Sequence, residues 1–505
     1  MKISRLCLLI ALSLPLINHA QNYSNIDFAH RISEKDVKKN IKALTAYKMQ
    51  GRETGTEGQK LAAAYIYSQF KQYGLRGTTN STDSLSYFQA FIMSKSCTPT
   101  GTLSVNGKLF NNYKDFIADP IQDSISKDLE IVFIGNHPIE KYSEADLSNK
   151  AVLFLTSNFH SAFTEVDRIR KYSKAKFIFF ADPFHDHLFE KHLKTKKHVL
   201  NRMYHLSELA EHNKNPFDSL KSPEQYDFFK SLKEVHIIPI STKLVKTMTG
   251  LKTKELKRLM TSRKTLKKSS ENRIKLKLKK NSLNIKTENV IGLIKGCEKP
   301  EESIVISAHY DHLGIKKGAI YSGANDNASG VAALMEVAQA FKIAAKNGKK
   351  PKRSILFVAF SGEEKGLLGS KFFVNHSPVP LEAIKTNLNM DMLGRQDEYH
   401  NSSNYIYLLG SSHLNPHLKQ ISDSLNALYT HLDLDYKLDH PDNPLYGASD
   451  QASFVKKGIP SIMYFNGLHK DYHTPEDLSE KLNYKAIEKV AKLVFLTAWE
   501  LANNP

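Results

Sequence analysis

The sequence predicts an α/β protein with a mixed, mostly parallel sheet, helices on both faces of that sheet, and an inserted β-rich domain. From Ser303 onward, short apolar segments alternate with longer amphipathic ones, which is the pattern of strands followed by helices. The short segments are apolar on consecutive residues, as in strands that are buried on both faces. Polar residues that often bind metal ions lie at or just beyond the ends of several of these segments.

The C-terminal region contains the clearest individual elements. One helix face carries Val331, Leu334, Ala338 and Phe341, which are spaced by three and four residues. The expected strands are residues 304–308, 355–360, 385–390, 405–409 and 460–465, and the expected helices are residues 329–345, 366–374, 416–429 and 484–502.

Nearer the N-terminus, residues 36–74 have helical periodicity that is broken by the turn-rich sequence GRETGTEGQ, residues 51–59. Residues 87–114 change to short strands, and Asn106-Gly107 is typical of a hairpin turn.

A chain of 505 residues is long enough for two domains. Lys2 and Arg5, an apolar stretch over 6–17 and Ala20 resemble a secretory signal peptide. No other stretch is long and apolar enough for a membrane-spanning helix. We expect a signal peptide at 1–20, the first part of the main domain at 21–117, the insert at 118–248, a basic linker at 249–282 and the rest of the main domain at 283–505. The protein is therefore predicted to be exported, to a periplasm or to the extracellular space.

The formal net charge of +19 raises the question of nucleic-acid binding. Much of the excess lies in residues 243–286, a tract with almost no aromatic residues to stack on bases and no nucleic-acid motif. We interpret the tract as a solvated linker and helix face; adsorption to an anionic cell surface is the alternative. Beyond the signal sequence, Cys97 and Cys297 could form a disulfide or remain free thiols.

Six residues form the candidate site. They are His309 in AHYDH, Asp326 in GANDNASG, Glu363 and Glu364 in SGEEKG, Asp391 in NMDMLG and His473 in DYHTPED. Ligands of open α/β sheets gather beyond the carboxyl ends of the strands, so these distant segments should converge. Imidazoles and carboxylates are the donors that zinc prefers. We interpret the set as a hydrolytic site for two metal ions, in which Asp326 is the natural bridge.

Two further positions follow from the local spacing. Glu363 and Glu364 are adjacent on a turn, so that one can bind a metal ion while the other faces a bound water. Asp311 lies two residues beyond His309 and could hold the second N–H of that imidazole. His312, next to it, is interpreted as a bystander.

The motifs AHYDHLG, GANDNASG, SGEEKGLLGS, NMDMLGR and YHTPED resemble the co-catalytic di-zinc aminopeptidases of the aminopeptidase S and aminopeptidase Y type, in the transferrin-receptor-like superfamily. The resemblance covers about residues 283–503 and the GRETGTEGQ region. The insert, with DFIADP and YSEADLSNKAVLFL, more loosely resembles a protease-associated domain.

This resemblance implies a zinc exopeptidase fold and two zinc ions per chain. His309 and Asp391 would bind one ion, Glu364 and His473 the other, and Asp326 would bridge them. Glu363 would be the general base for a metal-bridged hydroxide, and Asp311 would support His309. The family also implies a cis peptide bond after Asp326.

The segment LYGASDQASF implies that Tyr446 stabilises the tetrahedral intermediate. The family commonly has His where this chain has Gln451, which leaves the hydrogen bonding of that loop open. His469 lies close enough in sequence to His473 to be a candidate substrate contact.

The substrates implied are peptides with a free N-terminus, whose α-amino group would bind one zinc. The alternatives are a related zinc carboxypeptidase or acyl-amino-acid hydrolase, and a non-catalytic scaffold like transferrin-receptor ectodomains. Glutaminyl cyclases share the fold but use one zinc, so the presence of both His309 and Asp391 argues against them. The preferred N-terminal residue and the oligomeric state are left open by the sequence.

Overall fold

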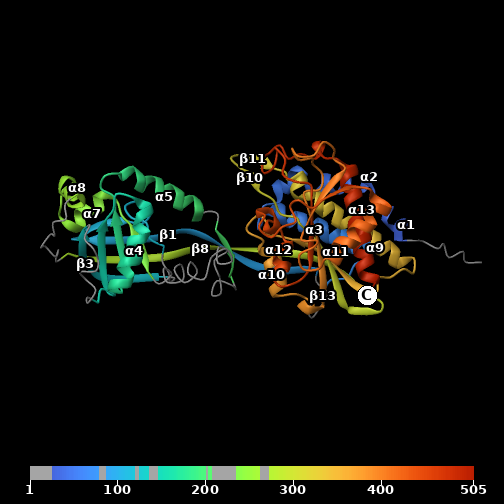
Figure 1. The fold of residues 1–505 in the computed structure, drawn as a ribbon, viewed down its shortest axis with the longest axis horizontal. Coiled ribbons are helices and arrows are strands. Elements are labelled where there is room, and N and C mark those ends of the chain that lie inside the picture. Colours follow the sequence, from blue (N-terminus) through green and yellow to red (C-terminus); the bar gives the residue numbers. More distant parts are fainter. Residues whose placement is uncertain are drawn as a thin grey trace, which may run out of the picture. The chain divides into compact units, whose positions relative to one another are not determined.

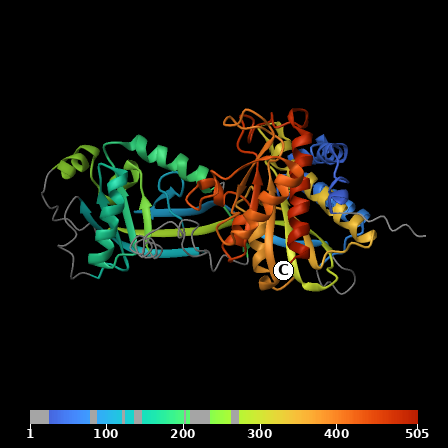
Figure 2. The ribbon, with the colours of Figure 1, turned by 45° about the vertical axis from the view of Figure 1, so that its right-hand side comes forward.

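The computed structural model describes residues 25–78, 87–119, 124–135, 146–200, 203–207, 235–261 and 272–504, and the predicted signal peptide at 1–20 lies outside them. The chain divides into two compact units, coloured along the sequence in Figures 1 and 2. Unit 1 comprises residues 1–89, 289–360 and 373–505, and unit 2 comprises residues 90–288 and 361–372. The insert thus begins earlier and ends later than the predicted 118 and 248.

Unit 1 is built on a mixed, mostly parallel sheet. Its strands, in spatial order, are β15 (Asp433–Asp435), β14 (Tyr405–Leu409), β16 (Ser461–Phe465), β13 (Ile384–Asp391), β9 (Lys299–His309), β12 (Arg353–Phe360) and the end of β8 (Arg273–Ile294). The four central strands run parallel, whereas β8 pairs antiparallel with β12, and β14 pairs antiparallel with β16. Every residue of β12 is buried, as the consecutive apolar residues predicted. The predicted fold class is confirmed.

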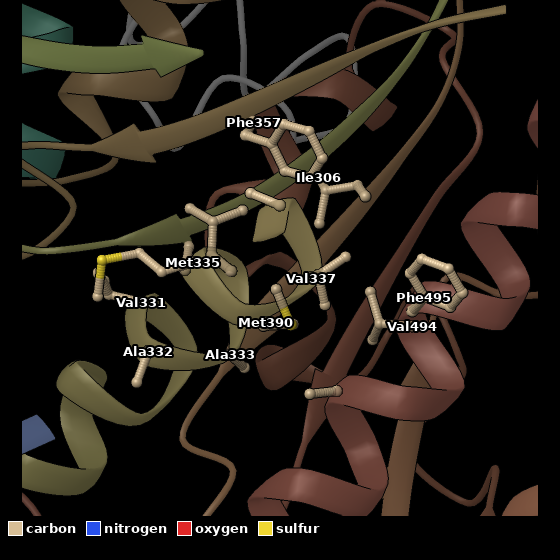
Figure 3. Close-up of a cluster of buried hydrophobic side chains, with 14 of the residues drawn as sticks. Ile306, Val331, Ala332, Ala333, Met335, Val337, Phe357, Met390, Val494 and Phe495 are labelled. Atoms are coloured by element: carbon tan, nitrogen blue, oxygen red, sulfur yellow. The ribbon is translucent and has the colours of Figure 1, made fainter. Parts of the chain in front are cut away.

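Helices cover both faces of this sheet. They are α1 (Asn25–Ala29), α2 (Glu34–Leu44), α3 (Glu57–Tyr73), α9 (Gly330–Lys346), α10 (Leu368–Asn375), α11 (His417–Leu425), α12 (Gln451–Val455) and α13 (Tyr484–Asn503). On one face, α9 and α13 pack against Ile306 and Phe357 of the sheet, as Figure 3 shows. On the other face, Phe373 of α10 and Phe454 of α12 pack against β12. The two layers hold the parallel strands in register.

One helical stretch among the described residues, Ala324–Lys346, is long and apolar enough by composition to cross a membrane. However, 78% of its most apolar window is buried inside the protein. By length and composition it departs from the expectation that no stretch beyond the signal sequence could span a membrane, although residues 329–345 were predicted to be a helix. Its composition is that of a central core helix.

Unit 2 is rich in strands and contains hydrophobic clusters of its own. Its strands are β1 (Phe88–Val105), β2 (Lys108–Asn111), β3 (Ser124–Gly135), β4 (Lys150–Leu155), β5 (Phe177–Ala181), β6 (Tyr204–Leu206), β7 (His236–Pro239) and the first part of β8. Strands β1 and β2 form the predicted hairpin, and Asn106 and Gly107 both have positive φ (50° and 79°), as its tight turn requires. Strands β3, β4, β5 and β7 are parallel neighbours.

The described part of unit 2 also contains helices that were not predicted from the sequence. These are α4 (Phe159–Ser173), α5 (Asp186–Leu200), α7 (Thr242–Thr249) and α8 (Thr253–Thr261). Their polar residues suggested turns, but sparse apolar positions such as Val166 and Ile169 in α4 are fully buried. A narrow apolar stripe is enough when a sheet already supplies most of the core.

The predicted basic linker at 249–282 also differs from the structure. Residues 273–280 belong to strand β8, where Ile274, Leu276 and Leu278 are buried between exposed basic residues. The alternation is the period-two pattern of a strand with one covered face. The basic residues at 273, 275, 277, 279 and 280 therefore lie on the exposed side of a strand.

Cys97 and Cys297 are both free thiols, which resolves the choice left open by the sequence.

A fully buried arginine joins three segments of unit 1. Arg52 ends the short helical segment Tyr47–Arg52, and its guanidinium donates to the carbonyl oxygens of Leu44 (2.9 Å), Tyr310 (2.8 Å), Ser322 (2.7 Å) and Gly323 (2.9 Å). The side chain is 0% exposed. A planar guanidinium has five donors in a fixed fork, so it can satisfy carbonyls on several sides at once. Arg52 thereby fixes the loops that follow β9 and precede α9.

We expect Arg52→Lys to lower the stability of the protein by about 2–4 kcal/mol, because an ammonium group cannot reach all four carbonyls and leaves some buried and unpaired. Thermal unfolding measures the loss. Arg31→Lys, at an exposed position, is the matched control. Equal stability of the two variants would contradict this role.

Helix α9 carries a buried carboxyl group. Glu336 is 1% exposed, and its Oε1 accepts a hydrogen bond from Asn40 Nδ2 at 2.9 Å. Burial, with a smaller contribution from Asp36, raises the pKa of Glu336 to about 8. The folded protein therefore keeps this carboxyl protonated at neutral pH, whereas the unfolded chain, with a glutamate pKa near 4.3, does not.

This difference makes the unfolding free energy depend on pH. The contribution of Glu336 is most favourable below about pH 4.3 and is lost as pH rises toward 8, by roughly 1.4 kcal/mol per pH unit. The unfolding free energy of Glu336→Gln minus that of the wild type should therefore increase by about 2–4 kcal/mol when the pH is raised from 5 to 8. Denaturant unfolding at both pH values tests this, with exposed Glu480→Gln as the control. If the difference in unfolding free energy between Glu336→Gln and the wild type is the same at both pH values, Glu336 is ionised in the folded state.

Candidate metal centre

The predicted ligands gather at the carboxyl ends of the parallel strands. His309 is the last residue of β9, and Asp391 is the last residue of β13. His309 lies level with Phe360, the last residue of β12, and Asp391 lies level with Phe465, the last residue of β16. Glu363 and Glu364 follow β12 directly in the chain, and His473 follows β16. The segment Ala324–Ser329 places Asp326 before α9.

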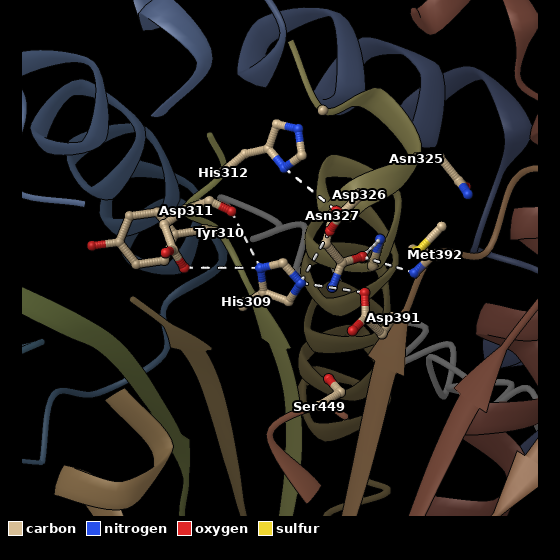
Figure 4. A network of polar contacts seen from close by, with 12 residues as sticks. His309, Tyr310, Asp311, His312, Asn325, Asp326, Asn327, Asp391, Met392 and Ser449 are labelled. Carbon is tan, nitrogen blue, oxygen red and sulfur yellow. Dashed lines mark hydrogen bonds and ion pairs between the residues drawn. The ribbon is translucent and has the colours of Figure 1, made fainter. Parts of the chain in front are cut away.

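The Asp326 carboxylate lies at the centre of this arrangement, and its two oxygens face different partners. Oδ1 is 3.3 Å from His309 Nε2, and Oδ2 is 3.1 Å from His473 Nε2. His309 Nε2 is also 3.3 Å from Asp391 Oδ1. Figure 4 shows His309 between Asp326 and Asp391. The Asp326 carboxylate therefore lies between His309 and His473, and its role as a bridge stays a prediction.

The donor set fits divalent metal ions. One ring nitrogen, His309 Nε2, is equally distant from two carboxylate oxygens, although a single N–H can make a good hydrogen bond to only one. Two ligands of a tetrahedral zinc ion, with bonds of 2.0–2.1 Å, lie about 3.3 Å apart. The distances of 3.1 and 3.3 Å between these donor atoms equal such an edge.

The electrostatics of Asp326 agree with a charged carboxylate. The residue is 3% exposed. Burial alone raises its pKa, but His312, His309 and His473 outweigh burial and hold the pKa of Asp326 well below its usual value. The carboxylate is therefore ionised and available as a ligand.

The potential ligand atoms form two groups, and each group is compact enough to hold one metal ion. His309, Glu363 and Asp391 form one group, and His312, Asp326, Glu364 and His473 form the other; within each group the atoms lie within 4.8 Å of one another. All predicted ligands are thus included. The structure adds Glu363, which was predicted to be the base, and His312, which was interpreted as a bystander.

Asp311 contacts His309 differently from the prediction. His309 Nδ1 lies 3.2 Å from the main-chain oxygen of Asp311 and 3.8 Å from its carboxylate Oδ1. The other carboxylate oxygen, Oδ2, accepts a hydrogen bond from Thr54 Oγ1 at 2.6 Å. The hydrogen bond that orients His309 is therefore made by the backbone of Asp311, and its carboxylate links the loop to the N-terminal segment.

His312 points into the site. Its Nδ1 lies 3.5 Å from Asp326 Oδ2, and its side chain is fully buried. The interpretation of His312 as a bystander is wrong, because the chain turns after β9 and brings residue 312 back over Asp326 (Figure 4). Sequence spacing alone could not show this turn.

His469 is 9% exposed, and neither of its ring nitrogens has a hydrogen-bond partner within the described ranges. Burial, followed by the charge of Arg395, lowers the pKa of His469 to about 4, so that the ring is neutral. The contact of His469 with substrate stays a prediction.

Side chains of the GANDNASG segment tie the Asp326 loop to the end of β13. Asn325 Oδ1 accepts from Gly394 N at 2.7 Å, Asn327 Nδ2 donates to Met390 O at 2.9 Å, and Ser329 Oγ accepts from Leu393 N at 3.0 Å. These bonds fix Asp326 relative to Asp391. The polar composition of the motif was the only sequence signal for them.

Asp477 holds the same loop from the other side. Its carboxylate accepts hydrogen bonds from the backbone N–H groups of Asn325 and Asp326, each at 3.0 Å. Burial raises the pKa of Asp477. The peptide bond between Asp326 and Asn327 is cis, which confirms what the family resemblance implied.

Tyr446 lies in a buried cluster with Met392, next to Asp391 in the chain. Its hydroxyl is buried and has no hydrogen-bond partner in the described part of the chain. Burial, with a contribution from Asp439, raises the pKa of Tyr446 to about 12, so the hydroxyl keeps its proton. Gln451 Nε2 donates to the Tyr446 carbonyl at 2.9 Å and so holds this loop. The catalytic role of Tyr446 stays a prediction.

Comparison with known proteins places these features in a family. Residues 289–498 match the family described as Peptidase family M28. The chain is 29% identical to aminopeptidase YwaD of Bacillus subtilis over 231 residues, which is 42% of this chain and 44% of YwaD. It is 31% identical to leucine aminopeptidase 2 of Trichophyton rubrum over 193 residues, 38% of this chain and 36% of that protein. The matches span about half, or less, of the length of such curated relatives.

The fold of this chain is similar to that of a protein of known structure. An aminopeptidase from Aneurinibacillus sp. strain AM-1 aligns with 95% of this chain and 97% of its own, with a TM-score of 0.50 and 18% identity. At this identity the likeness shows the fold alone. The strand-end residues lie within the matched segment: residues 289–498, less than half of this chain, are similar to Peptidase family M28.

Proposed function

We propose that this protein is an exported aminopeptidase that holds two zinc ions and hydrolyses the N-terminal peptide bond of peptides with a free N-terminus. The observation that carries the proposal is the Asp326 carboxylate: its Oδ1 faces His309, which also contacts Asp391, and its Oδ2 faces His473. The names of the relatives, aminopeptidase and leucine aminopeptidase, support the reaction type.

In this proposal, His309 and Asp391 hold one ion, Glu364 and His473 hold the other, and Asp326 is shared. When bound, such a pair of ions supplies Lewis acidity and lowers the pKa of a bound water toward neutrality. The buried loops around Asp326 hold its carboxylate in place, so that this shared donor needs no rearrangement.

Glu363 accepts a proton from the attacking water and returns it to the departing amine. The ligand atoms of Glu363, His309 and Asp391 form one group, so the Glu363 carboxylate could bind a metal ion instead of acting as the base. We assign Glu363 as the base and Glu364 as the ligand because the family resemblance implies these roles, and because adjacent side chains on the turn after β12 can point in different directions. The Tyr446 hydroxyl keeps its proton and has no hydrogen-bond partner among the described residues, and we propose that it donates to the oxyanion.

Glu363→Gln should retain zinc while turnover falls at least about a hundredfold, because the amide cannot accept the proton. Metal analysis and initial rates on an aminoacyl amide measure both quantities. Glu398→Gln, an exposed glutamate of unit 1, is the control. Normal turnover in the Glu363 variant would refute the assigned base, and loss of zinc would make Glu363 a ligand.

The substrate class is tested by pairing each free aminoacyl amide with its N-acetylated form, with and without a chelator. We expect hydrolysis of the free amides only, and its loss on chelation. Cleavage restricted to acetylated or C-terminal substrates would indicate the acyl-amino-acid hydrolase or carboxypeptidase alternative. Protein without zinc and without activity would indicate a receptor-like scaffold.

Export and the nature of the insert are also proposals. The sequence of residues 1–20 supports a signal peptide, and the insert is proposed to be protease-associated-like. N-terminal sequencing of the mature protein from periplasm and medium tests the first point. A mature chain that still begins at Met1 would contradict it.

A further inference from the structure

Two imidazoles converge on the same oxygen of Asp326. His473 Nε2 lies 3.1 Å from Oδ2, and His312 Nδ1 lies 3.5 Å from it. The two rings are 5.8 Å apart between centroids and inclined by 64°, so each presents a nitrogen to Oδ2 without stacking on the other. The separation of His312 Nδ1 from Oδ2 is close to the edge of about 3.3 Å between two ligands of one tetrahedral zinc ion.

The His312 ring is held in this orientation by its surroundings. The side chain is 0% exposed, and the backbone N–H of His312 donates to the Arg52 carbonyl at 3.2 Å. Gly323 has a φ of +55°, and a Cβ at that position would lie 2.4 Å from both Cγ and Cδ2 of His312. The missing side chain of Gly323 therefore makes the space in which the imidazole sits.

We propose that His312 binds a metal ion directly through Nδ1, on the Oδ2 side of Asp326 and beside His473. This assignment adds a ligand to the five that the sequence predicts, and it rests on the metal centre proposed above. The ring is buried, its nitrogen faces the shared carboxylate at ligand spacing, and a glycine accommodates it.

The additional imidazole makes the two halves of the centre unequal. The Oδ1 side has one imidazole, from His309, and the Asp391 carboxylate. The Oδ2 side has two imidazoles, from His312 and His473, and the Glu364 carboxylate. Imidazole-rich sites favour zinc over ions such as manganese or magnesium, which prefer oxygen ligands. The Oδ2 half should fill first with zinc and hold it more tightly.

The test uses the full chain, stripped of metal and titrated with Zn²⁺ against a chromophoric chelator. We compare the wild type with His312→Asn, and with His417→Asn as the control, since His417 is exposed on α11. In the wild type and the control, we expect two ions with unequal affinity. In His312→Asn, the tighter of the two should weaken at least about tenfold while the other changes little.

X-ray absorption of the zinc-loaded wild type gives a second measurement that does not depend on how any variant folds. His309, His312 and His473 as ligands correspond to three imidazoles for two ions, whereas the sequence-predicted set gives two. Two imidazoles, or unchanged zinc affinity in folded His312→Asn, would overturn the assignment and leave His312 as a hydrogen-bond partner of Asp326. A wild type that binds no zinc would instead overturn the proposed function itself.

Discussion

The buried charge of Asp326 is the constraint on which the rest of the centre depends. Moving a carboxylate out of water costs several kcal/mol unless opposite charge or good donors replace the water. Here the compensation comes from His309, His312 and His473, whose ring nitrogens lie 3.1–3.5 Å from its two oxygens. These imidazoles keep the group ionised although it is only 3% exposed. Bound cations stabilise such a buried carboxylate, whereas removing one of its three histidine partners raises the free-energy cost of keeping it buried.

Holding such a group in place requires support from outside the ligand set. Asp477 binds the backbone N–H groups before the cis bond, and Arg52 binds the carbonyls of the loops that carry His312 and Asp326. Asn325, Asn327 and Ser329 then connect this loop to the end of β13. None of these contacts is with a substrate. Their common effect is that the ligands cannot move independently, which keeps the metal-binding geometry fixed.

Charge is distributed unevenly between the insert and the rest of the chain. Residues 90–288 contain 36 Lys and Arg against 22 Asp and Glu, a net of +14, whereas the remaining residues contain 35 against 30, a net of +5. The strong basic character of the chain is therefore mainly a property of the insert.

The sequence by itself determined the order of strands and helices after Ser303 and the ligands at the strand ends, because buried parallel strands need consecutive apolar residues and their carboxyl ends share one edge. It did not determine that residues 273–280 form a strand, since a half-covered basic strand has too few apolar residues to stand out from a linker. Only the tertiary structure decided the place of His312 and the role of Arg52. Both depend on loops that fold back on themselves, and no periodicity in a sequence records where such a loop returns.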